Sequence, residues 1–591
     1  MLALFGLALC MRLLWVAFLL SKHPALVKYP AVDGAFYHQW AQEILSNTGA
    51  AHQAFFAHPL YPHVMAALYK VFAVDPLVVI LFQCVLGSVG CLLMVTLVRL
   101  LFSEAAAWWA GGLLAVFWPA VANAGLLESV EVGNFCLLAA LLAWTWTLKS
   151  KRVWSTAMLA GAFLGLAALC RGNLLLLAPA FAFAGLAKGV GRGSAMVLCL
   201  CAGLALPLAA VGVRNRVVTG QWMFLTGHSG VALYSGFTPG NTTGTYQPPA
   251  FVRPEPRYEQ QDFHTEAERR IGHALTAADS SRYWRQQAWA TIVAQPGTAA
   301  RAAVNKLGLT LAAYEVADNY SLPYLQSLLL PAWFPLPGFG LLLVAAVIGM
   351  GAAWHRRTEL AWVYAGVLFY VGTLLLFFVS SRMRAPLWIL LLPFAGAGVV
   401  YARECWADLP WRGLVMRFAP ALGLLCVVQG MAPASMRSRD RSQALAMHGI
   451  SLERAGRFVE ALDREERALR LDGGNAFLLV NAGQLRLRLN DVAAGQRLCA
   501  RALALRGNSA PAHACLGVAE ARQGNLEQAR AHLLQAAALD SKDISTKLNL
   551  AIVRGRSGEE KEAQALLDEL AQEAPNDPAV QSVLRALRAG R

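Results

Sequence analysis

Long apolar runs separated by short polar stretches fill the chain up to about residue 431. The runs have the length of roughly 17–25 residues that an α-helix needs to cross a bilayer. The pattern therefore predicts an all-α fold that begins with a polytopic membrane helix bundle of about eleven transmembrane helices. We expect these helices near 2–20, 77–98, 106–126, 130–148, 155–170, 173–187, 194–213, 334–354, 360–379, 386–401 and 413–431.

The pattern changes beyond residue 440, where small residues recur every 34 positions. One series is Gly456, Asn490, Gly524 and Gly558; a second is Ala461, Gly495, Ala529 and Ala563. This period, with small residues where two helices touch, is typical of tetratricopeptide repeats. We expect about four such repeats to stack into an α-solenoid, which binds a peptide or protein in its groove or braces a neighbouring domain. The chain thus divides into a membrane module, 1–432, and a repeat domain, 440–591.

Composition and charge narrow the class of protein. Apolar residues make up 57% of the 591 positions and charged residues only 15%, which excludes a purely cytosolic enzyme. In a membrane protein, the net charge of +15 is most simply explained by lysine and arginine in cytoplasmic loops and by attraction to lipid surfaces. Nucleic-acid binding is not indicated, because no basic run is interleaved with aromatic residues. The cysteines lack CxxC spacing, which argues against a zinc site or a disulfide framework. Cys499 and Cys515 fall in adjoining helices and could pair outside the cytoplasm, but we expect two free thiols.

Positive charge between the runs predicts the orientation. Basic residues follow the fourth, sixth and eighth runs, so these loops share the cytoplasmic side. The segments 21–76 and 214–333 and the repeats then face the outside. The first run lacks a basic leader and a cleavage site, so we expect a retained helix. Arg12 inside it is expected to snorkel or pair with another helix. The basic loop residues are Lys149, Lys151, Arg152, Lys188, Arg192, His355, Arg356 and Arg357.

The first outer segment carries candidate chemistry next to the membrane. Asp33 precedes an amphipathic helix and is either its N-cap or a functional carboxylate. The stretch that follows, HPLYPHVMAALYKVF, begins at His58 and adds aromatic side chains and prolines. Histidines in this segment lack the spacing of a metal site on one helix face, which leaves a divalent cation as an open alternative only.

Several stretches, taken in order, resemble one family. Asp33, Tyr37 and Ala41 form a D-x-x-x-Y-x-x-x-A arrangement, followed by Pro-Leu-Tyr-Pro at 59–62. Later stretches are LLESVEVGNF with Glu128, CRGNLLLLAP with Arg171 and Asn173, GFTPGNTTGTYQPP, YEVADNY, and SSRMRAPLWILLLPFAG with Arg382 and Arg384. Together they resemble the integral-membrane type C glycosyltransferases, in the dolichyl-phosphate-mannose–protein mannosyltransferase-like branch, over most of residues 1–400. Bacterial members also carry tetratricopeptide repeats behind this module. Gly34, where some members have a second acid, and Met383, where an aromatic residue is commoner, depart from the pattern and leave the substrate open.

The resemblance implies an enzyme that moves a hexose or pentose from a polyprenyl-phosphate donor to an acceptor. Asp33 is the expected general base of an inverting transfer, and Glu128 is expected to help position the acceptor or a cation. Arg171, Arg382 and Arg384 lie on the side where arginine has no topological role, and arginine binds phosphate with a planar fork. We expect these three arginines and His58 at the donor phosphate, and Tyr37, Tyr61 and Asn173 in the substrate cleft.

The expected location is the cytoplasmic (inner) membrane of a bacterium, with the repeats extracytoplasmic. Expected partners are the sugar-bearing polyprenyl phosphate, membrane lipids, and an acceptor protein or glycan recruited by the repeats. The sequence indicates no specific cofactor. The alternatives are a non-catalytic membrane-anchored scaffold for envelope assembly and, less favoured, a transporter, because inverted repeats and mid-span polar residues are not evident.

Overall fold

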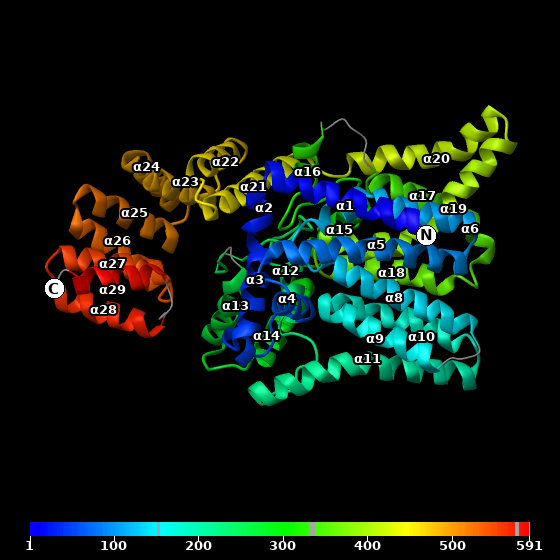
Figure 1. Ribbon diagram of the computed structural model, residues 1–591, viewed down its shortest axis with the longest axis horizontal. Helices are drawn as coiled ribbons and strands as arrows, with labels where there is room; N and C mark the ends of the chain where they lie inside the picture. The colour runs from blue at the N-terminus through cyan, green and yellow to red at the C-terminus, as the bar shows by residue number, and fades with distance from the viewer. Residues whose placement is uncertain (151–153, 250, 254–255, 331–336, 574–577, 590–591) are drawn as a thin grey trace. The chain divides into compact units, whose positions relative to one another are not determined.

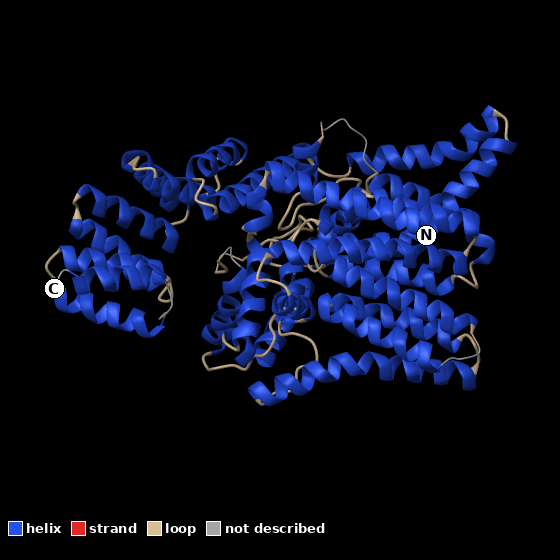
Figure 2. Cartoon of the chain, viewed as in Figure 1, coloured by secondary structure: helices blue, strands red, loops and turns tan. Residues whose placement is uncertain are grey.

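The computed structural model describes residues 1–591 except 151–153, 250, 254–255, 331–336, 574–577 and 590–591 (Figure 1). Across these described ranges the regular elements are helices, and no strand occurs (Figure 2). The expected all-α fold is confirmed. The chain divides into two compact units, Met1–Met436 and Arg437–Arg591, which we call the membrane unit and the repeat unit.

In the described part of the membrane unit, seven helices are long and apolar enough to cross a bilayer, or eight if one bent pair counts as a span. The bent pair is α6 (Glu104–Val116) with α7 (Trp118–Ala124). Each of the eleven expected runs falls on one of these helices or on a shorter apolar one, although 334–336 lie outside the described residues. The seven long helices are α1 (Leu2–Lys22), α5 (Pro76–Leu101), α8 (Val130–Lys149), α11 (Val190–Thr219), α17 (Phe339–Ala352) with the turn after it, α19 (Ser381–Asp408) and α20 (Trp411–Gly430). The shorter apolar helices are α9 (Trp154–Cys170), the 3-10 helix η2 (Gly172–Leu177) with α10 (Ala178–Leu186), and α18 (Ala361–Leu376).

Glycines let the apolar helices approach closely. A Cβ at Gly161 or Gly203 would collide with the backbone of the facing helix where α9 meets α11. Gly349 and Gly398 make the same kind of contact between α17 and α19. Small residues at helix crossings are the usual means of packing in a bilayer, where apolar burial gives no net drive. By contrast, α20 buries only Val428 and otherwise presents its side chains outward.

The third expected span is broken in its middle. The chain turns by 50° between α6 and α7, because Pro119 lacks the N–H and the space that a continuing helix needs. The bend is held from outside the pair: the Trp118 backbone N–H donates to the Pro337 carbonyl (2.9 Å) and its indole to Leu322 (3.3 Å). After α7 the chain leads into the buried turn that carries Glu128.

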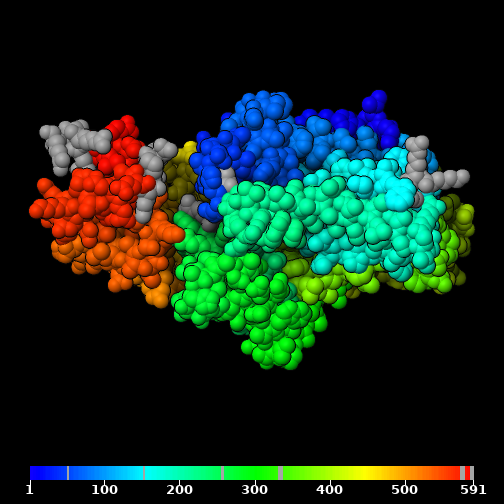
Figure 3. Space-filling model, turned by 90° about the horizontal axis from the view of Figure 1, so that it is seen from below, coloured from blue at the N-terminus to red at the C-terminus, as the bar shows by residue number. Residues whose placement is uncertain are grey.

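The two outer segments gather at one end of the helix bundle, where the labels of α3, α4 and α12–α14 lie in Figure 1. Trp284 is fully buried there; its ring packs on Tyr234 and Phe263, and its indole donates to the Phe263 carbonyl (2.9 Å). Figure 3 shows the second segment, in green, projecting from the cyan helices. Residues 331–333 of this segment lie outside the described residues. The helices here are α2 (Pro24–Lys28), α3 (Val32–Ser46), α4 (Leu60–Val71), α12 (His228–Gly236), α13 (Pro256–Ile271), α14 (Ala277–Ala294), α15 (Pro296–Leu311) and α16 (Leu322–Leu329).

Basic residues gather at the opposite end of the bundle. Lys149 donates to the carbonyl of Leu100, and Arg356 donates to that of Leu101 (2.9 Å), so both lie where α5 ends. Arg192 donates to the Ser150 carbonyl in the same region (2.5 Å). Two further residues expected here, Lys151 and Arg152, lie outside the described residues. The geometry therefore separates the basic end of the bundle from the end that holds the outer segments.

Arg12 does not snorkel. It is 1% exposed, and its guanidinium donates to the carbonyls of Ala8 (3.0 Å) and Ala115 (3.5 Å). Gly87 makes room for it, because a Cβ there would meet both Arg12 and Glu131. Arg12 is thus held between helices α1, α5 and α6, which agrees with the second expected alternative.

The repeat unit is a series of helix pairs. In each of four pairs the first helix ends on a residue with positive φ: Gly456 (74°), Asn490 (66°), Gly524 (87°) and Gly558 (84°). The 34-residue period therefore marks left-handed helix ends, where glycine and asparagine are favoured. This confirms the expected tetratricopeptide solenoid. The helices are α21 (Ala434–Arg454), α22 (Phe458–Leu471), α23 (Ala476–Arg488), α24 (Val492–Leu505), α25 (Ala510–Gln523), α26 (Leu526–Leu539), α27 (Ile544–Arg556), α28 (Glu560–Glu573) and α29 (Pro578–Ala589).

The expectation of two free thiols in this unit is wrong. Cys499 of α24 and Cys515 of α25 form a disulfide between neighbouring repeats. Gly483 on α23 makes the space for it, because a Cβ there would collide with the Cys499 sulfur. The bridge joins residues 16 apart in sequence.

Candidate active site

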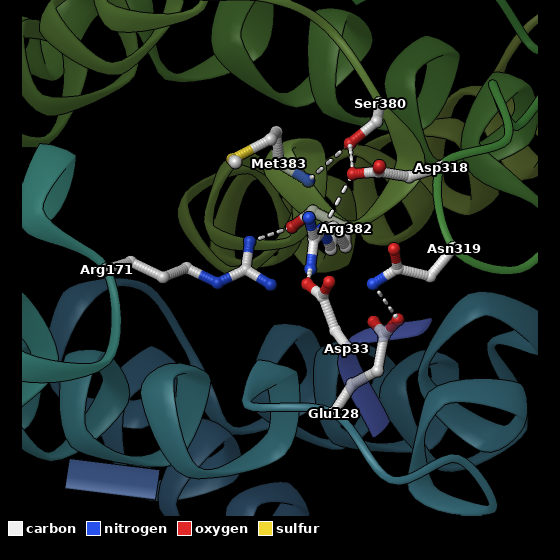
Figure 4. Close-up of polar contacts among 8 residues, drawn as sticks. All are labelled: Asp33, Glu128, Arg171, Asp318, Asn319, Ser380, Arg382 and Met383. Carbon is white, nitrogen blue, oxygen red and sulfur yellow. Dashed lines mark hydrogen bonds and ion pairs between the residues drawn. The ribbon is translucent and has the colours of Figure 1, made fainter. Parts of the chain in front are cut away.

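Arg382 stands at the centre of a cluster of charged residues at the end of the bundle that holds the outer segments (Figure 4). It lies in the first turn of α19 and forms ion pairs with two carboxylates from distant parts of the chain. One is Asp33 in the first turn of α3, bound through Nη1; the other is Asp318, bound through Nε at 2.6 Å. All three side chains are 15–18% exposed, so the cluster is sheltered but open to a ligand.

The start of α19 is built to hold Arg382 in place. Ser380 is the N-cap, and its hydroxyl also donates to Asp318 (2.9 Å). Four residues after Arg382 stands Pro386, which has no N–H to give to the Arg382 carbonyl. Arg171, between α9 and η2, donates to that carbonyl instead. A proline within α19 thus leaves a backbone oxygen free, and this oxygen ties Arg171 to Arg382.

Glu128 approaches the cluster from the turn between α7 and α8. It is 4% exposed, and it accepts a hydrogen bond from the Asn319 side chain (3.0 Å). Burial raises the pKa of Glu128, and the charge of Arg382 opposes that rise. Glu128 therefore holds a proton more readily than a water-exposed glutamate, and it stands beside the groups that hold Asp33.

Tyr37 and Tyr61 form the floor next to Asp33. Their rings meet edge to face with centroids 5.2 Å apart, and Tyr61 is fully buried, its hydroxyl donating to Gln83 (2.7 Å). Burial, with the nearby Asp33 charge, raises the pKa of Tyr37, which stays neutral. Tyr61 therefore packs against Tyr37, and Tyr37 has Asp33, Arg382 and Arg171 as charged neighbours.

His58 lies beside Arg171 as a neutral ring. Its Nε2 accepts from the Gly172 backbone N–H (3.4 Å). Burial, together with the charges of His228, Arg171 and Arg382, lowers the pKa of His58 to about 3. His58 can therefore contact a ligand by hydrogen bonding but cannot supply a positive charge to a phosphate.

Neither Asn173 nor Arg384 makes a direct polar contact with the Asp33–Arg382 pair. The Asn173 amide donates to Tyr370 (3.3 Å), whose hydroxyl donates to the Met383 carbonyl (2.8 Å), so Asn173 braces the start of α19. Arg384 is 0% exposed and points to the other side of α19, where it pairs with Glu315 (2.7 Å).

Neighbouring groups stabilise the buried positive charge of Arg384. Its guanidinium donates to the carbonyls of Leu309, Ala312 and Tyr314 and lies over the Phe339 ring at 4.2 Å. The expectation that Arg384 binds the donor phosphate does not fit this enclosure, because the guanidinium is sealed from any ligand.

Sequence reasoning missed three members of the site: Asp318, Asn319 and Ser380. Two of them stand in the YEVADNY stretch, which marks the region but offers no spacing that assigns a role. Ser380 looks like any N-cap before a helix. Among the described residues, no group of three or more His, Cys, Asp or Glu side chains is placed to hold a metal ion.

Comparison with known proteins agrees with the two units. Residues 57–214 match the family model described as dolichyl-phosphate-mannose-protein mannosyltransferase, and residues 520–587 match the model of the tetratricopeptide repeat. The first match includes Glu128 and Arg171 and ends before Asp318 and Arg382. No curated protein matches the chain in sequence.

Similar solved structures are tetratricopeptide proteins. MamA from Desulfovibrio magneticus is 20% identical, with 30% of this chain and 94% of that chain covered and a TM-score of 0.21. The Arabidopsis OM64 domain is 19% identical (20% and 98% covered, TM-score 0.19), and YrrB is 18% identical (32% and 90% covered, TM-score 0.22). The chain thus joins a membrane unit, of which residues 57–214 match the dolichyl-phosphate-mannose-protein mannosyltransferase family of membrane glycosyltransferases, to a C-terminal tetratricopeptide unit.

Proposed function

We propose that the protein transfers a sugar from a polyprenyl-phosphate donor to an acceptor hydroxyl at the outer face of the cytoplasmic membrane, with inversion. The observation that carries the proposal is the cluster in Figure 4: two arginines and an aspartate meet at one end of the helix bundle, beside a buried glutamate. The family match gives the class of reaction. The cluster gives groups for both halves of it, a cationic site for phosphate and a carboxylate for proton removal.

The donor phosphate would bind Arg382 and Arg171. Two guanidinium groups can hold phosphate oxygens through charge-assisted hydrogen bonds in a planar fork. A polyprenyl chain keeps its carbon tail in the bilayer and its phosphate at the surface, which is the level of the helix ends that carry these residues. The same cations would stabilise the charge on the leaving polyprenyl phosphate as the glycosidic bond breaks.

Asp33 would act as the general base. The acceptor oxygen attacks the anomeric carbon, its proton passes to the Asp33 carboxylate, and the bond from that carbon to the phosphate oxygen breaks, leaving its electron pair on the phosphate. Glu128, buried beside Asn319, would hydrogen-bond the acceptor and position its hydroxyl. Tyr37 would line the sugar cleft, because its ring packs next to Asp33.

The orientation rests on two independent features. Basic residues gather at the end of the bundle away from the site, which is the pattern of a cytoplasmic face. The repeat unit carries a disulfide, and structural disulfides persist in oxidising compartments. The first feature supports a site outside the cytoplasm and the second supports repeats outside the cytoplasm, and we infer that the repeats recruit an acceptor protein or glycan there.

The test is a transfer assay with a panel of polyprenyl-phosphate sugars and the purified wild-type protein, together with Asp33→Asn. The amide keeps the shape of the carboxylate but cannot accept the proton, so turnover should fall by about 100-fold or more. Near-normal turnover by Asp33→Asn would refute the base assignment. A folded wild-type protein that neither binds nor turns over any donor would favour the scaffold alternative.

A further inference from the structure

The two carboxylates that hold Arg382 are anchored very differently. Asp318 also accepts the Ser380 hydroxyl, and the neighbouring Ser381 N–H donates to the Val316 carbonyl (2.8 Å). Two hydrogen bonds therefore join the loop that carries Asp318 to the start of α19. Asp318 and Arg382 are held on one rigid corner of the fold.

The Asp33 carboxylate is held by fewer contacts than that of Asp318. The helix that carries it, α3, starts without a side-chain cap, and its first residue, Val32, has φ of 48°. A β-branched residue in this region of φ is strained, because its Cβ crowds the backbone. The contact that fixes the Asp33 carboxylate in the structure is the ion pair with Arg382. The rest of α3 is held by packing that does not involve this pair, because Gly34, Tyr37, Trp40 and Ala41 are buried.

We propose that Asp33 and the donor phosphate compete for Arg382, so that donor binding itself releases the catalytic base. In the free enzyme Asp33 occupies Nη1 of the guanidinium, and one of its oxygens is engaged. When the phosphate takes that position, Asp33 is freed to accept the acceptor proton. Asp318 keeps its hold on Nε throughout and is a positioning residue. This inference rests on the proposed function, and it adds an order of events: donor first, then acceptor.

The charges favour such an exchange. Arg171 and Arg382 carry two positive charges, matched in the free enzyme by Asp33 and Asp318. A phosphate is a stronger competitor than a carboxylate here, because it can engage both guanidinium groups at once through several oxygens. Displacing Asp33 leaves the fixed pair with Asp318 intact, so the arginine does not move from the helix end. A pair that occupies Arg382 for about nine tenths of the time would weaken phosphate binding about tenfold.

The experiment measures binding of a polyprenyl phosphate without sugar to the full-length protein in detergent, for wild type, Asp33→Asn and Asp318→Asn. Asp33→Asn should bind about tenfold more tightly than wild type, because the competitor is gone. Asp318→Asn should bind more weakly, because Arg382 loses its fixed partner. A purely structural role for both aspartates would weaken binding in both variants. Glu104→Gln, which removes the partner of Arg99 at the far end of the bundle, is the matched control and should bind like wild type.

The outcomes separate this inference from the proposed function. A wild-type protein that binds the lipid and transfers sugar, with an Asp33→Asn variant that binds no more tightly, refutes the competition and leaves the function standing. A wild-type protein that neither binds nor transfers refutes the function itself. Tighter binding by Asp318→Asn as well would refute its role as the fixed anchor. Thermal unfolding of each variant, compared with Glu104→Gln, shows whether the fold is preserved.

Discussion

Arg382 and Arg384 are two residues apart, but Arg382 lies in the candidate site and Arg384 in a buried ion pair. This contrast can be tested. Consider Arg384→Met, which fills similar volume without charge. It would leave Glu315, whose side chain is 9% exposed, without its cationic partner. It would also strip the guanidinium donors from the carbonyls of Leu309, Ala312 and Tyr314. Removing one member of a buried ion pair costs about 3–5 kcal/mol.

Arg382→Lys should behave in the reverse way. Arg382 is 18% exposed, unlike the fully buried Arg384, so the fold should tolerate a lysine there. The lysine keeps the charge but loses the planar fork, and a charged hydrogen bond of about 1.5–3 kcal/mol corresponds to a loss of roughly 10- to 150-fold in donor affinity. We therefore expect a stability defect without a donor-affinity defect at Arg384, and a donor-affinity defect without a stability defect at Arg382.

Two measurements on the same detergent-purified samples decide the matter: the half-life of the folded state at one elevated temperature, and the donor KM of the folded fraction. A rescue variant sharpens the test. Arg384→Met combined with Glu315→Leu should recover much of the lost half-life, since an apolar pair often replaces a buried ion pair without loss. A raised donor KM in Arg384→Met with an unchanged half-life would show that Arg384 reaches the ligand, and the structural reasoning would fail.

Three further predictions concern the acceptor, the topology and the disulfide. Glu128→Gln should raise the acceptor KM about tenfold while donor affinity stays the same, measured by acceptor titration at saturating donor; an unchanged acceptor KM would leave Glu128 a packing role only. Alkaline phosphatase, which is active only outside the cytoplasm, should be active when fused after Arg591 and inactive when inserted at Gly189; activity at Gly189 would reverse the proposed orientation. Cys499→Ser should destabilise the full chain by about 3 kcal/mol, the value for a loop of this length, and make limited proteolysis insensitive to reductant; wild-type protein that is equally insensitive would show that the bridge does not form.

The apolar runs predicted the helices well because a bilayer demands continuous apolar length, and length can be read from the chain. The break at Pro119 could not be placed in the same way. A proline inside a run can kink a span, end it or be absorbed, and here the outcome depends on Pro337 and Leu322, which come some 200 residues later. The 34-residue period was equally legible, because each repeat ends its first helix on a residue that tolerates positive φ.

The sequence allowed the residue types of the site to be predicted, but not the directions in which their side chains point. Successive residues of a helix point about 100° apart, so Arg382 and Arg384 face different sides of α19 although both are arginines in one motif. The side of α19 that faces away from the ligand is the one covered by Glu315 and three backbone carbonyls. These groups belong to another segment, so the sequence of α19 does not reveal them. Asp318 and Asn319 follow no period and no metal spacing, so only the fold shows that they complete the cluster.

The outward-facing surface of α20 has a consequence for how such a protein can change over evolutionary time. The helix that leads to the repeats buries one residue, Val428, so little of its surface is covered by the rest of the protein. Away from Val428, whose carbonyl accepts the Ala313 N–H (2.9 Å), substitutions along it need only preserve length and apolarity, and a different array of repeats can follow it without altering this contact. Under the proposed function, the membrane unit and the repeats can therefore diversify at separate rates, the first constrained by the buried charges around Arg382 and the second by the acceptor.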